Sequence, residues 1–310
     1  MSRSEILVTG GGGLLGTALR PLLPQARFLT RKDCDLRDGR AVDRLFSETR
    51  PERAVHLAAR VGGVRENAAH NAELLEDNVL INANVLRAAR AVGTRHVVSI
   101  LSSCAYEFYP DRPSFEEDLH AGLPFGGNLG YGYSKRLLDV HSRLLWEQGR
   151  IRASTVTPVT MYGPGDNFDL ESGHVAASLI RKALAAKREG GPLEVWGTGN
   201  AVRQFVFAAD IAKLVVDVLE GAGEPDRLIA APDAGITIRD LAQAVAKAAE
   251  FSGPLVFDAA KPEGAPRRVL ESRSLARRFP GRRWTPLAEG LRATVRWLER
   301  SRPDLLPAKA

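Results

Sequence analysis

Thr9-Gly10-Gly11-Gly12-Gly13-Leu14-Leu15-Gly16 stands between the apolar run 6–8 and a helical pattern at 15–23. In a strand, loop and helix of this kind, Gly10 permits a tight turn, Gly13 lets a pyrophosphate approach the backbone, and Gly16 lets the helix pack closely on the strand. Free amide groups at the start of the helix favour the negative charge of a diphosphate. A glycine-rich turn without a ligand is the alternative, but the position between a strand and a helix favours a dinucleotide site.

Outward from this loop, short apolar runs alternate with helical patterns up to about residue 160. This alternation is typical of a parallel sheet that carries helices on both faces. The expected strands are 6–8, 27–30, 53–57, 96–101 and 151–157, and the expected helices are 15–23, 40–47, 72–92 and 131–149. The sequence therefore predicts an α/β fold with a Rossmann-like, doubly wound parallel sheet.

The pattern changes after residue 164, where a polar stretch leads into a helix at 174–188. Strands at 193–196, 204–207 and 254–257 and helices at 210–219 and around 287–298 follow. We expect residues 1–164 to form a cofactor-binding Rossmann domain, with part of 200–230 returning to it. Residues 165–310 are expected to form a smaller, interleaved C-terminal α/β domain that binds the substrate. Asp210 is expected to cap the helix that follows it.

Composition excludes several classes of protein. The 310 residues are 44% hydrophobic and 26% charged, as in ordinary soluble proteins, and no apolar run approaches the ~18 residues that span a bilayer. The 43 basic and 37 acidic side chains give a net charge of +6, which suits a small anionic ligand, whereas 6% aromatic residues argue against a nucleic-acid surface. Two cysteines allow no disulfide framework, and because a strand is expected from Glu5, no signal sequence is expected. We expect a cytoplasmic protein that binds neither membranes nor nucleic acids.

The end of the second expected strand indicates which nicotinamide cofactor binds. An acidic residue there would bind the ribose 2′-hydroxyl and repel a 2′-phosphate. The sequence instead has Arg31, which can bind a phosphate through two N–H groups, so NADPH is expected rather than NADH. A solvated basic turn is the alternative. Asp35 and Leu36 are expected near the adenine. Ala58, after the third expected strand, is expected beside the cofactor backbone, because its small side chain leaves room for it.

Tyr131 and Lys135 are four residues apart at the start of an expected helix, so both side chains lie on one face. A lysine ammonium near a phenol is expected to lower the pKa of the tyrosine, which can then exchange a proton with a substrate oxygen. Lys135 is also expected to hold the cofactor ribose. Ser102, at the end of a buried strand, is expected to bind the same substrate oxygen. Tyr133 has no lysine four residues beyond it.

These motifs resemble the extended short-chain dehydrogenase/reductase family, and within it the GDP-L-fucose synthases. The resemblance covers nearly the whole chain and is carried by residues 102–106, 131–135, 162–168, 172–175, 195–199 and 203–205. It implies epimerisation of the two carbons that flank the ketone of a GDP-4-keto-6-deoxy-hexose, followed by reduction of the ketone with NADPH. It further implies that Ser102, Tyr131 and Lys135 form the reductase triad, and that Cys104 and His174 are the epimerisation pair.

The residue types suit this chemistry. Carbons beside a ketone are acidic because an enolate places its charge on oxygen, and inversion needs a base on one face and an acid on the other. Cys104, two residues beyond Ser102 on an expected extended segment, is expected on the same side as the serine. His174 is expected to approach from the other domain. A packing cysteine and a capping or surface histidine are the alternatives. The other histidines show no metal-ligand spacing, so no metal site is expected.

The resemblance also implies how the nucleotide sugar is held. Arg203 is expected to contact the diphosphate, Trp196 to lie in the nucleotide pocket, and Arg268 to occupy a basic substrate-binding position. Arg181 could also face the nucleotide, although a lone arginine is usually solvated. Relatives pair through two long helices, so a homodimer through helices 72–92 and 131–149 is expected. Leu137, Leu138, Val140, Leu144 and Leu145 support one apolar face, which either contacts the second copy or packs into the core.

Three departures from the family pattern leave open which sugar the protein binds. Thr160 replaces an asparagine, Gly165 replaces a histidine, and residues 107–109 lengthen the loop after Cys104. Another GDP-4-keto sugar, or one modified at the sixth carbon, fits equally well. An enzyme with only the reductase or only the epimerase activity is the nearest alternative. A dinucleotide-sensing regulator is an alternative of another class, which the intact serine, tyrosine and lysine set disfavours.

Overall fold

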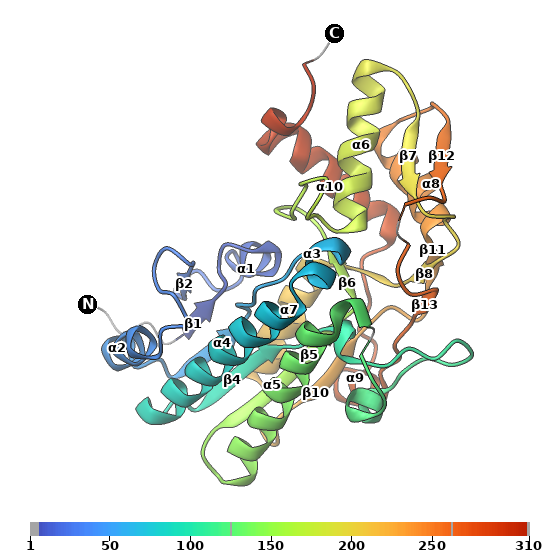
Figure 1. The fold of residues 1–310 in the computed structure, drawn as a ribbon. Helices are drawn as coiled ribbons and strands as arrows, with labels where there is room; N and C mark the ends of the chain where they lie inside the picture. The colour runs from blue at the N-terminus through green and yellow to red at the C-terminus, as the bar shows by residue number, and fades with distance from the viewer. Residues whose placement is uncertain (1–5, 125, 262, 309–310) are drawn as a thin grey trace.

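A six-stranded sheet forms the centre of the first lobe in the computed structural model, which describes residues 6–124, 126–261 and 263–308. Its strands are all parallel, in the order β10-β5-β4-β3-β1-β2 (Figure 1). Their bounds are β1 Ile6–Thr9, β2 Arg27–Leu29, β3 Arg53–His56, β4 His96–Ile100, β5 Arg152–Pro158 and β10 Arg227–Ala230. Glu5, where the first strand was expected to begin, lies outside the described residues. The predicted fold class is confirmed.

Helices cover both faces of this sheet, which explains why its central strands are apolar throughout. Every residue of β4 is buried, because a parallel strand with helices on both sides has no solvent face. α2 Gly39–Thr49, α4 Asn71–Val92 and α5 Leu129–Glu147 pack beside one another on one face, with the short α3 Val64–Ala69 before α4. α1 Leu14–Leu19 and α7 Ala208–Glu220 pack together on the other face (Figure 1).

The second lobe is built mainly from residues beyond 164 around its own apolar core. α6 Val175–Glu189, α8 Ile238–Ala249 and α10 Leu287–Ser301 pack around this core with the strand pair β7 Leu193–Trp196 and β12 Leu255–Asp258. Short strands β8 Val202–Arg203, β11 Ile236–Thr237 and β13 Arg267–Arg268 form a small sheet, and β6 Thr160–Tyr162 pairs with β9 Phe205–Phe207. α9 Arg273–Arg278 packs against β10.

The chain crosses between the lobes more than once. After β7, β8 and β9 in the second lobe, α7 and β10 return to the first, and β10 becomes the edge strand beside β5. Side chains of both elements, such as Ile211 and Leu228, lie in the core of the first lobe. The second lobe resumes with β11. The two lobes are therefore interleaved in sequence.

Asp210 does not cap α7, contrary to the sequence prediction. The helix begins at Ala208 after Phe207, so Asp210 lies inside its first turn. Its carboxylate instead accepts hydrogen bonds from the Thr285 backbone N–H at 2.7 Å and the Thr285 hydroxyl at 3.0 Å. The residue thereby ties α7 to the segment before α10, a contact across 75 positions of sequence.

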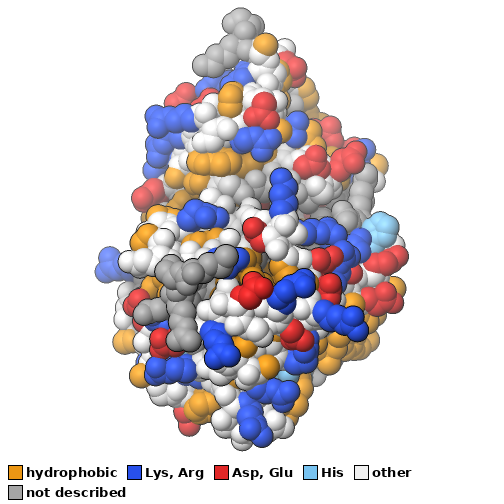
Figure 2. All heavy atoms as spheres, turned by 90° about the vertical axis from the view of Figure 1, so that its left-hand side faces the viewer, with side chains coloured by type: hydrophobic (Ala, Val, Ile, Leu, Met, Phe, Trp, Pro, Cys, Tyr) orange, Lys and Arg blue, Asp and Glu red, His pale blue; other side chains and the backbone are white. Residues whose placement is uncertain are grey.

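The surface carries mixed charge on the face that Figure 2 shows, where basic and acidic side chains are interspersed. No helix within the described ranges combines the length and the apolar character that a bilayer crossing requires. The same residues contain no group of three or more His, Cys, Asp or Glu side chains that could hold a metal ion.

Candidate active site

A large cleft of about 1010 Å³ lies between the carboxyl ends of the parallel strands and the second lobe. Ligands of open α/β sheets bind at this edge. Nearly all of the site residues predicted from the sequence line the cleft, namely Gly10, Gly13, Gly16, Arg31, Asp35, Leu36, Ala58, Ser102, Cys104, Tyr131, Lys135, His174, Trp196, Arg203 and Arg268. The structure therefore brings residues from β1 to β13 into one site.

The glycine loop fits a dinucleotide because it presents bare backbone, and at Gly10 and Gly16 a side chain would not fit at all. Gly10 has φ of 71°, and a Cβ atom there would lie 2.7 Å from the backbone nitrogen of Ala58. A Cβ at Gly16 would lie 2.7 Å from the carbonyl oxygen of Gly10, so only glycine lets α1 approach the loop this closely. At Gly13 the nearest atom would be 3.6 Å away. The backbone of Gly13 thus borders the cleft without a side chain between them.

The turn after β2 presents Arg31 to the cleft. Asp33 fixes this turn, because its carboxylate accepts hydrogen bonds from the Thr30 N–H and hydroxyl, both at 2.7 Å. Arg31 is exposed, and it forms no ion pair with another residue in the described part of the chain. Leu36, only 8% exposed, supplies an apolar floor nearby. These features fit an adenosine whose ribose carries a phosphate.

Tyr131 and Lys135 project from α5 into the cleft, both almost completely buried. Lys135 Nζ donates a hydrogen bond to the Ile100 carbonyl at 2.8 Å, and burial lowers the pKa of Lys135 to about 8. The sequence prediction that Lys135 lowers the pKa of Tyr131 is wrong. Burial and the charge of Cys104 raise that pKa, against a hydrogen bond with Ser102 that lowers it. The phenol is therefore protonated at neutral pH and can act as a proton donor.

Cys104 lies on the 3-10 turn η1 Ser103–Ala105, and not on the extended segment that the sequence analysis assumed. The turn is closed by Ser102, whose hydroxyl accepts the Cys104 N–H at 3.2 Å. Two donors approach the sulfur, Nδ2 of Asn128 and Nη1 of Arg268, each at 3.5 Å. Both can stabilise the negative charge of a deprotonated thiol.

His174 reaches the cleft from the residue that precedes α6. Its Nδ1 lies 3.7 Å from a carboxylate oxygen of Asp166, whose side chain is 3% exposed. Hydrogen bonding to Asp166 and its negative charge raise the pKa of His174, while desolvation and the positive charge of Arg268 oppose the rise. The other oxygen of Asp166, Oδ2, is buried with no hydrogen-bond partner in the described residues. The arrangement favours an imidazolium that can donate a proton.

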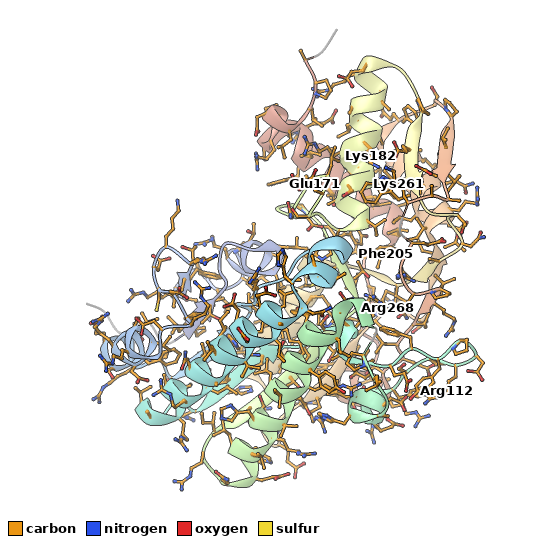
Figure 3. The ribbon with its side chains drawn as sticks, in the orientation of Figure 1. Arg112, Glu171, Lys182, Phe205, Lys261 and Arg268 are labelled. Carbon is orange, nitrogen blue, oxygen red and sulfur yellow. The ribbon has the colours of Figure 1, made fainter. Side chains whose placement is uncertain are left out.

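The second lobe contributes a cationic wall. Arg203 is 9% exposed, and burial together with the charge of Arg268 lowers its pKa to about 10. Arg268 Nε is buried without a hydrogen-bond partner in the described segments. Beyond them, Lys182 Nζ lies 5.0 Å and Lys261 Nζ 5.8 Å from the ring centroid of Trp196. Figure 3 shows these two lysines in the second lobe, with Arg268 nearer to the first.

Arg181 is not brought into the cleft, so the prediction that it faces the nucleotide is wrong. Its guanidinium is held by the carbonyl oxygens of Leu305 and Phe168, at 3.0 and 3.1 Å. Lys182 lines the cleft instead. Helical spacing could have indicated this, because Lys182 is two turns beyond His174 and shares a face with Ser178.

Other cleft residues escaped the sequence analysis. They are Asp166, Asn128, Arg60, Asp77 and Glu263. Glu263, which accepts the Thr198 hydroxyl at 2.8 Å, comes from a loop far from any recognised motif. Asn128 precedes α5 but makes no side-chain capping bond. Because Asn128 occupies a usual capping position, its sequence favours a cap and gives no signal of a contact with sulfur.

Residues 6–230 match the NAD dependent epimerase/dehydratase family. The chain belongs to this family. It is also 33% identical to a GDP-L-fucose synthase of Dictyostelium discoideum, over 96% of this chain and 95% of that protein. Its identity to a probable GDP-L-fucose synthase of Drosophila melanogaster is 36%, over 94% and 96% of the two chains.

A solved structure gives the same result. A GDP-L-fucose synthetase from Naegleria fowleri bound to NADP superposes with a TM-score of 0.86 and 31% identity, covering 96% of this chain and 94% of that one. The expected resemblance to the GDP-L-fucose synthases and the expected enzyme class are therefore confirmed. The roles of individual residues rest on the geometry described above.

Proposed function

We propose that this protein epimerises the two carbons beside the ketone of a GDP-linked 4-keto-6-deoxy-hexose and reduces the ketone with NADPH. The observation that carries the proposal is the meeting of two sets of groups in one cleft: the Ser102 and Tyr131 hydroxyls, and the Cys104 and His174 pair with their own partners. Full-length similarity to GDP-L-fucose synthases, and a relative solved with NADP, support the substrate class and the cofactor.

The epimerisation is a proton exchange at carbon. Cys104 Sγ, as thiolate, removes the hydrogen beside the ketone, and the electron pair of that C–H bond moves to the carbonyl oxygen. Ser102 and Tyr131 stabilise the oxygen charge by donating hydrogen bonds. His174, protonated and held by Asp166, then delivers a proton to the opposite face of the carbon. Solvent returns both groups to their starting protonation states.

The reduction uses the same two hydrogen-bond donors to the ketone oxygen, Ser102 and Tyr131. NADPH, when bound, supplies a hydride to the carbonyl carbon. Tyr131 donates its phenolic proton to the oxygen, for which the raised pKa keeps the phenol in the required form. Lys135, held against the Ile100 carbonyl, is positioned to bind the cofactor ribose. Gly10, Gly13 and Gly16 form the backbone cradle for its diphosphate.

The cationic wall suits the diphosphate and base of the substrate. Arg203 is buried and Arg268 is half-buried. The buried Nε of Arg268 donates to no acceptor in the described residues, so it is available to a bound ligand. A substrate diphosphate supplies such an acceptor. Trp196, with Lys182 beside its ring, provides a flat surface for the nucleotide base.

Solvent exchange tests the proposal. The protein is incubated in deuterated water with GDP-4-keto-6-deoxy-mannose, first without NADPH and then with it. We expect deuterium at two ring carbons in both cases and ketone reduction only with NADPH. Cys104→Ser is expected to lower the exchange by about 100-fold or more while NADPH still binds. Exchange that survives in Cys104→Ser would disprove the assigned base, and absence of exchange in the wild type would leave a plain reductase.

The sugar itself is tested with a panel. Thr160 and Gly165 both line the cleft, and Gly165 has φ of 84°, which disfavours restoring a side chain there. GDP-, UDP-, dTDP- and CDP-linked keto sugars are compared by NADPH oxidation. We expect activity with the GDP-linked members, including those modified at the sixth carbon. Equal activity with UDP-linked sugars would contradict the proposed nucleotide.

We further propose a homodimer formed through α4 and α5. Large apolar side chains on the outer surfaces of these helices are exposed, with Leu80 at 48%, Leu137 at 50% and Leu144 at 44%. A second copy would cover them. Light scattering in solution, which gives the mass directly, tests this.

A cytoplasmic location is proposed as well, since both cysteines are free and suit a reducing compartment. Fractionation of cells tests this location.

A further inference from the structure

Two buried asparagines form a chain of hydrogen bonds that ends at the sulfur of Cys104. Asn67, on α3, and Asn128, the last residue of the 3-10 turn η3 Gly126–Asn128, are each 4% exposed and border the cleft. The backbone N–H of Gly62 donates to Asn67 Oδ1 at 3.1 Å. Asn67 Nδ2 donates to Asn128 Oδ1 at 2.8 Å, and Asn128 Nδ2 lies 3.5 Å from Cys104 Sγ.

One backbone group determines the direction of this chain. A side-chain amide has an oxygen that only accepts hydrogen bonds and a nitrogen that only donates them, on two ends of nearly the same shape. Because the N–H of Gly62 can only donate, Asn67 must turn its oxygen toward Gly62 and its nitrogen toward Asn128. Asn128 then turns its oxygen toward Asn67, which leaves its nitrogen facing Cys104. The sulfur therefore meets an N–H donor and not a carbonyl oxygen.

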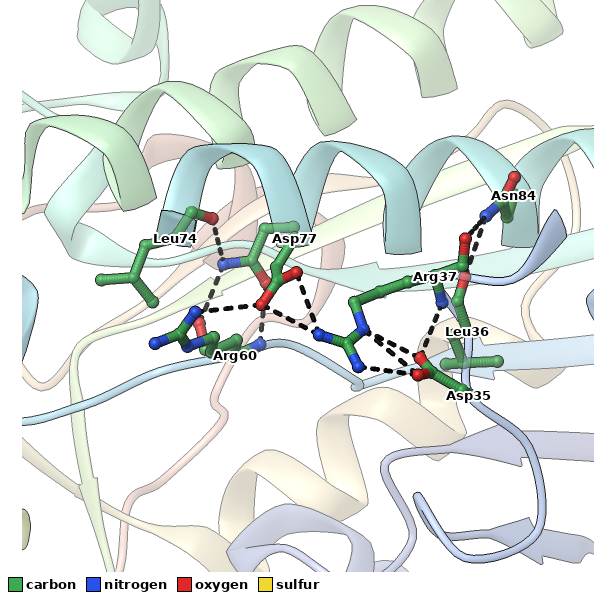
Figure 4. Close-up of polar contacts among 8 residues, drawn as sticks. Asp35, Leu36, Arg37, Arg60, Leu74, Asp77 and Asn84 are labelled. Atoms are coloured by element: carbon green, nitrogen blue, oxygen red, sulfur yellow. Dashed lines mark hydrogen bonds and ion pairs between the residues drawn. The ribbon is translucent and has the colours of Figure 1, made fainter. Parts of the chain in front are cut away.

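The segment that carries the Gly62 N–H is anchored on α4. Asn78, which is completely buried, accepts the Arg60 N–H at 2.9 Å and donates to the Arg60 carbonyl at 2.8 Å (Figure 4). The side chain of Arg60 donates from Nη1 to Asp77, on the same helix, at 3.1 Å. Both the backbone and the side chain of Arg60 are thus fixed two residues before Gly62.

The other end of the chain is anchored on the same helix. Asn71, the first residue of α4, accepts the Gly130 N–H at 3.0 Å and donates to the Gly126 carbonyl at 3.4 Å. The backbone carbonyl of Asn71 also leaves no room for a Cβ atom at Gly130. The backbone on both sides of Asn128 is therefore held, and the amide stays beside the sulfur.

We propose that Asn128 stabilises the thiolate of Cys104 that the epimerisation needs, and that Asn67 is a positioning residue that decides which end of the Asn128 amide faces the sulfur. An N–H donor favours the ionised sulfur, whereas a carbonyl oxygen in its place would accept the S–H proton and favour the thiol. The inference rests on the proposed function, because it takes Cys104 as the base.

Charged and titratable groups on other elements also act on this sulfur. Arg268 Nη1, from β13, lies 3.5 Å from it. Arg203, on β8, and the phenol of Tyr131, on α5, interact with Cys104 electrostatically. These groups are all retained when Asn67 or Asn128 is replaced. A change in the ionisation of Cys104 in such variants therefore reports on the amide chain.

Alkylation by iodoacetamide tests the proposal, because the thiolate is the form that reacts. The full-length protein, without sugar or cofactor, is treated from about pH 5 to 10, and mass spectrometry follows the peptides of Cys104 and Cys34 separately. Asn128→Asp replaces the donor by a carboxylate of the same shape. At pH 7 we expect the rate at Cys104 to fall about tenfold, with the midpoint of its pH profile about one pH unit higher and an equal fitted plateau. Cys34 is the internal reference, and its profile is expected to stay unchanged.

Asn67→Asp separates positioning from direct contact. One carboxylate oxygen still accepts the Gly62 N–H, but the other now requires Asn128 to turn its nitrogen away from the sulfur. We expect the rate at Cys104 to fall about threefold at pH 7, with the midpoint again higher. An unshifted midpoint in either folded variant, including one with a lowered plateau, would overturn the proposal. If melting curves show that Asn67→Asp does not fold, Asn67→Ala, which frees the Asn128 amide, is expected to shift the midpoint in the same direction, and an unshifted midpoint there has the same meaning.

Asn84→Asp is the matched control. Asn84 also belongs to α4, donates from Nδ2 to the carbonyl oxygens of Leu36 and Arg37 at 3.0 and 3.1 Å, and does not line the cleft (Figure 4). The same substitution there adds the same charge and is expected to leave the Cys104 profile unchanged, so an equal shift would contradict a specific role of the chain.

The alkylation test is independent of the proposed reaction. A wild type that exchanges no deuterium into a GDP-linked keto sugar would disprove the epimerisation, whatever the alkylation profiles are. Unshifted profiles in Asn67→Asp and Asn128→Asp, in a protein whose wild type does exchange deuterium, would instead disprove the role of the two asparagines and leave the reaction intact.

Discussion

At His174 two neighbours act on the charge of the imidazole in opposite directions. Asp166 raises the pKa through a hydrogen bond and its negative charge, and Arg268 opposes this with its positive charge. Because Asp166 is itself buried, and its second oxygen has no partner among the described residues, it has little access to water that could weaken the contact. The acid form of His174 therefore persists to higher pH than in a free imidazole.

Replacing Asp166 tests this effect. Proton delivery by His174 requires its protonated form, so epimerisation falls as pH rises through the pKa of His174. In Asp166→Asn the raising influence is removed, and the fall is expected at lower pH than in the wild type. Deuterium incorporation measured from about pH 5 to 9 gives the profile. An identical alkaline limb in both proteins would rule out the assigned role of Asp166.

At the scale of elements, the packing of α1 against the glycine loop determines the shape of the loop. α1 can approach the backbone of Gly10 and Gly11, directly after β1, only because Gly16 has no side chain. The loop is thus a consequence of helix and strand packing.

Gly16→Ala is expected to weaken NADPH binding by roughly 10- to 100-fold, because its Cβ would lie 2.7 Å from the Gly10 carbonyl oxygen and would push the loop out of shape. Gly126→Ala is the control, since no atom of the described residues lies within 4 Å of the place that its Cβ would take. Titration with NADPH and melting curves distinguish lost binding from lost folding. Equal affinities in both variants would contradict the steric argument.

Elements whose signal is local were predictable from the sequence. β4 lies within its expected range because its apolar run reflects burial on both faces, and α4 ends at Val92, where the expected helix 72–92 also ends. Contacts between distant segments were not predictable. The bond between Asp210 and Thr285 requires the packed fold, and so does the contact of Arg37 with Asp77.

The candidate site follows the same division. The cleft contains the motif residues, because each motif follows a strand whose end lies at the same edge of the sheet. The choice between Arg181 and Lys182 could have been made by counting helical turns from His174, which places Lys182 and not Arg181 on the face toward the cleft. The raised pKa of Tyr131 depends on burial, which four-residue spacing cannot reveal. The domain boundary near residue 164 stays a prediction.

On the scale of the whole molecule, the exposed apolar surface of α4 and α5 is the contact that we propose between two copies of the chain. Leu137→Glu places a charge in the proposed contact between copies and is expected to convert a dimer into a monomer, because an unpaired buried charge is costly. Leu123→Glu, at a 63% exposed apolar residue outside these helices, is expected to leave the mass unchanged. Light scattering reports both. A dimer that persists in Leu137→Glu would place the contact elsewhere.

Acid stability is also a property of the whole fold. Burial lowers the pKa of His56 and of His96 to about 4, against a usual value near 6.5 in an unfolded chain. Between these values the unfolded chain binds more protons, so the free energy of unfolding falls as pH drops from about 6.5 to 4. His96→Gln removes one of the two groups, and the melting temperature is expected to depend less steeply on pH there. An unchanged slope would contradict this.

The return of β10 to the first sheet has a consequence for synthesis on the ribosome. β5 ends at Pro158, but the strand that covers its edge begins only at Arg227. At ~5–20 residues per second, the nascent chain spends several seconds with that edge unpaired. Open strand edges template association with other chains. Translation up to β10 is therefore the interval in which this protein is most prone to misassembly, and a chain truncated before Arg227 is expected to aggregate.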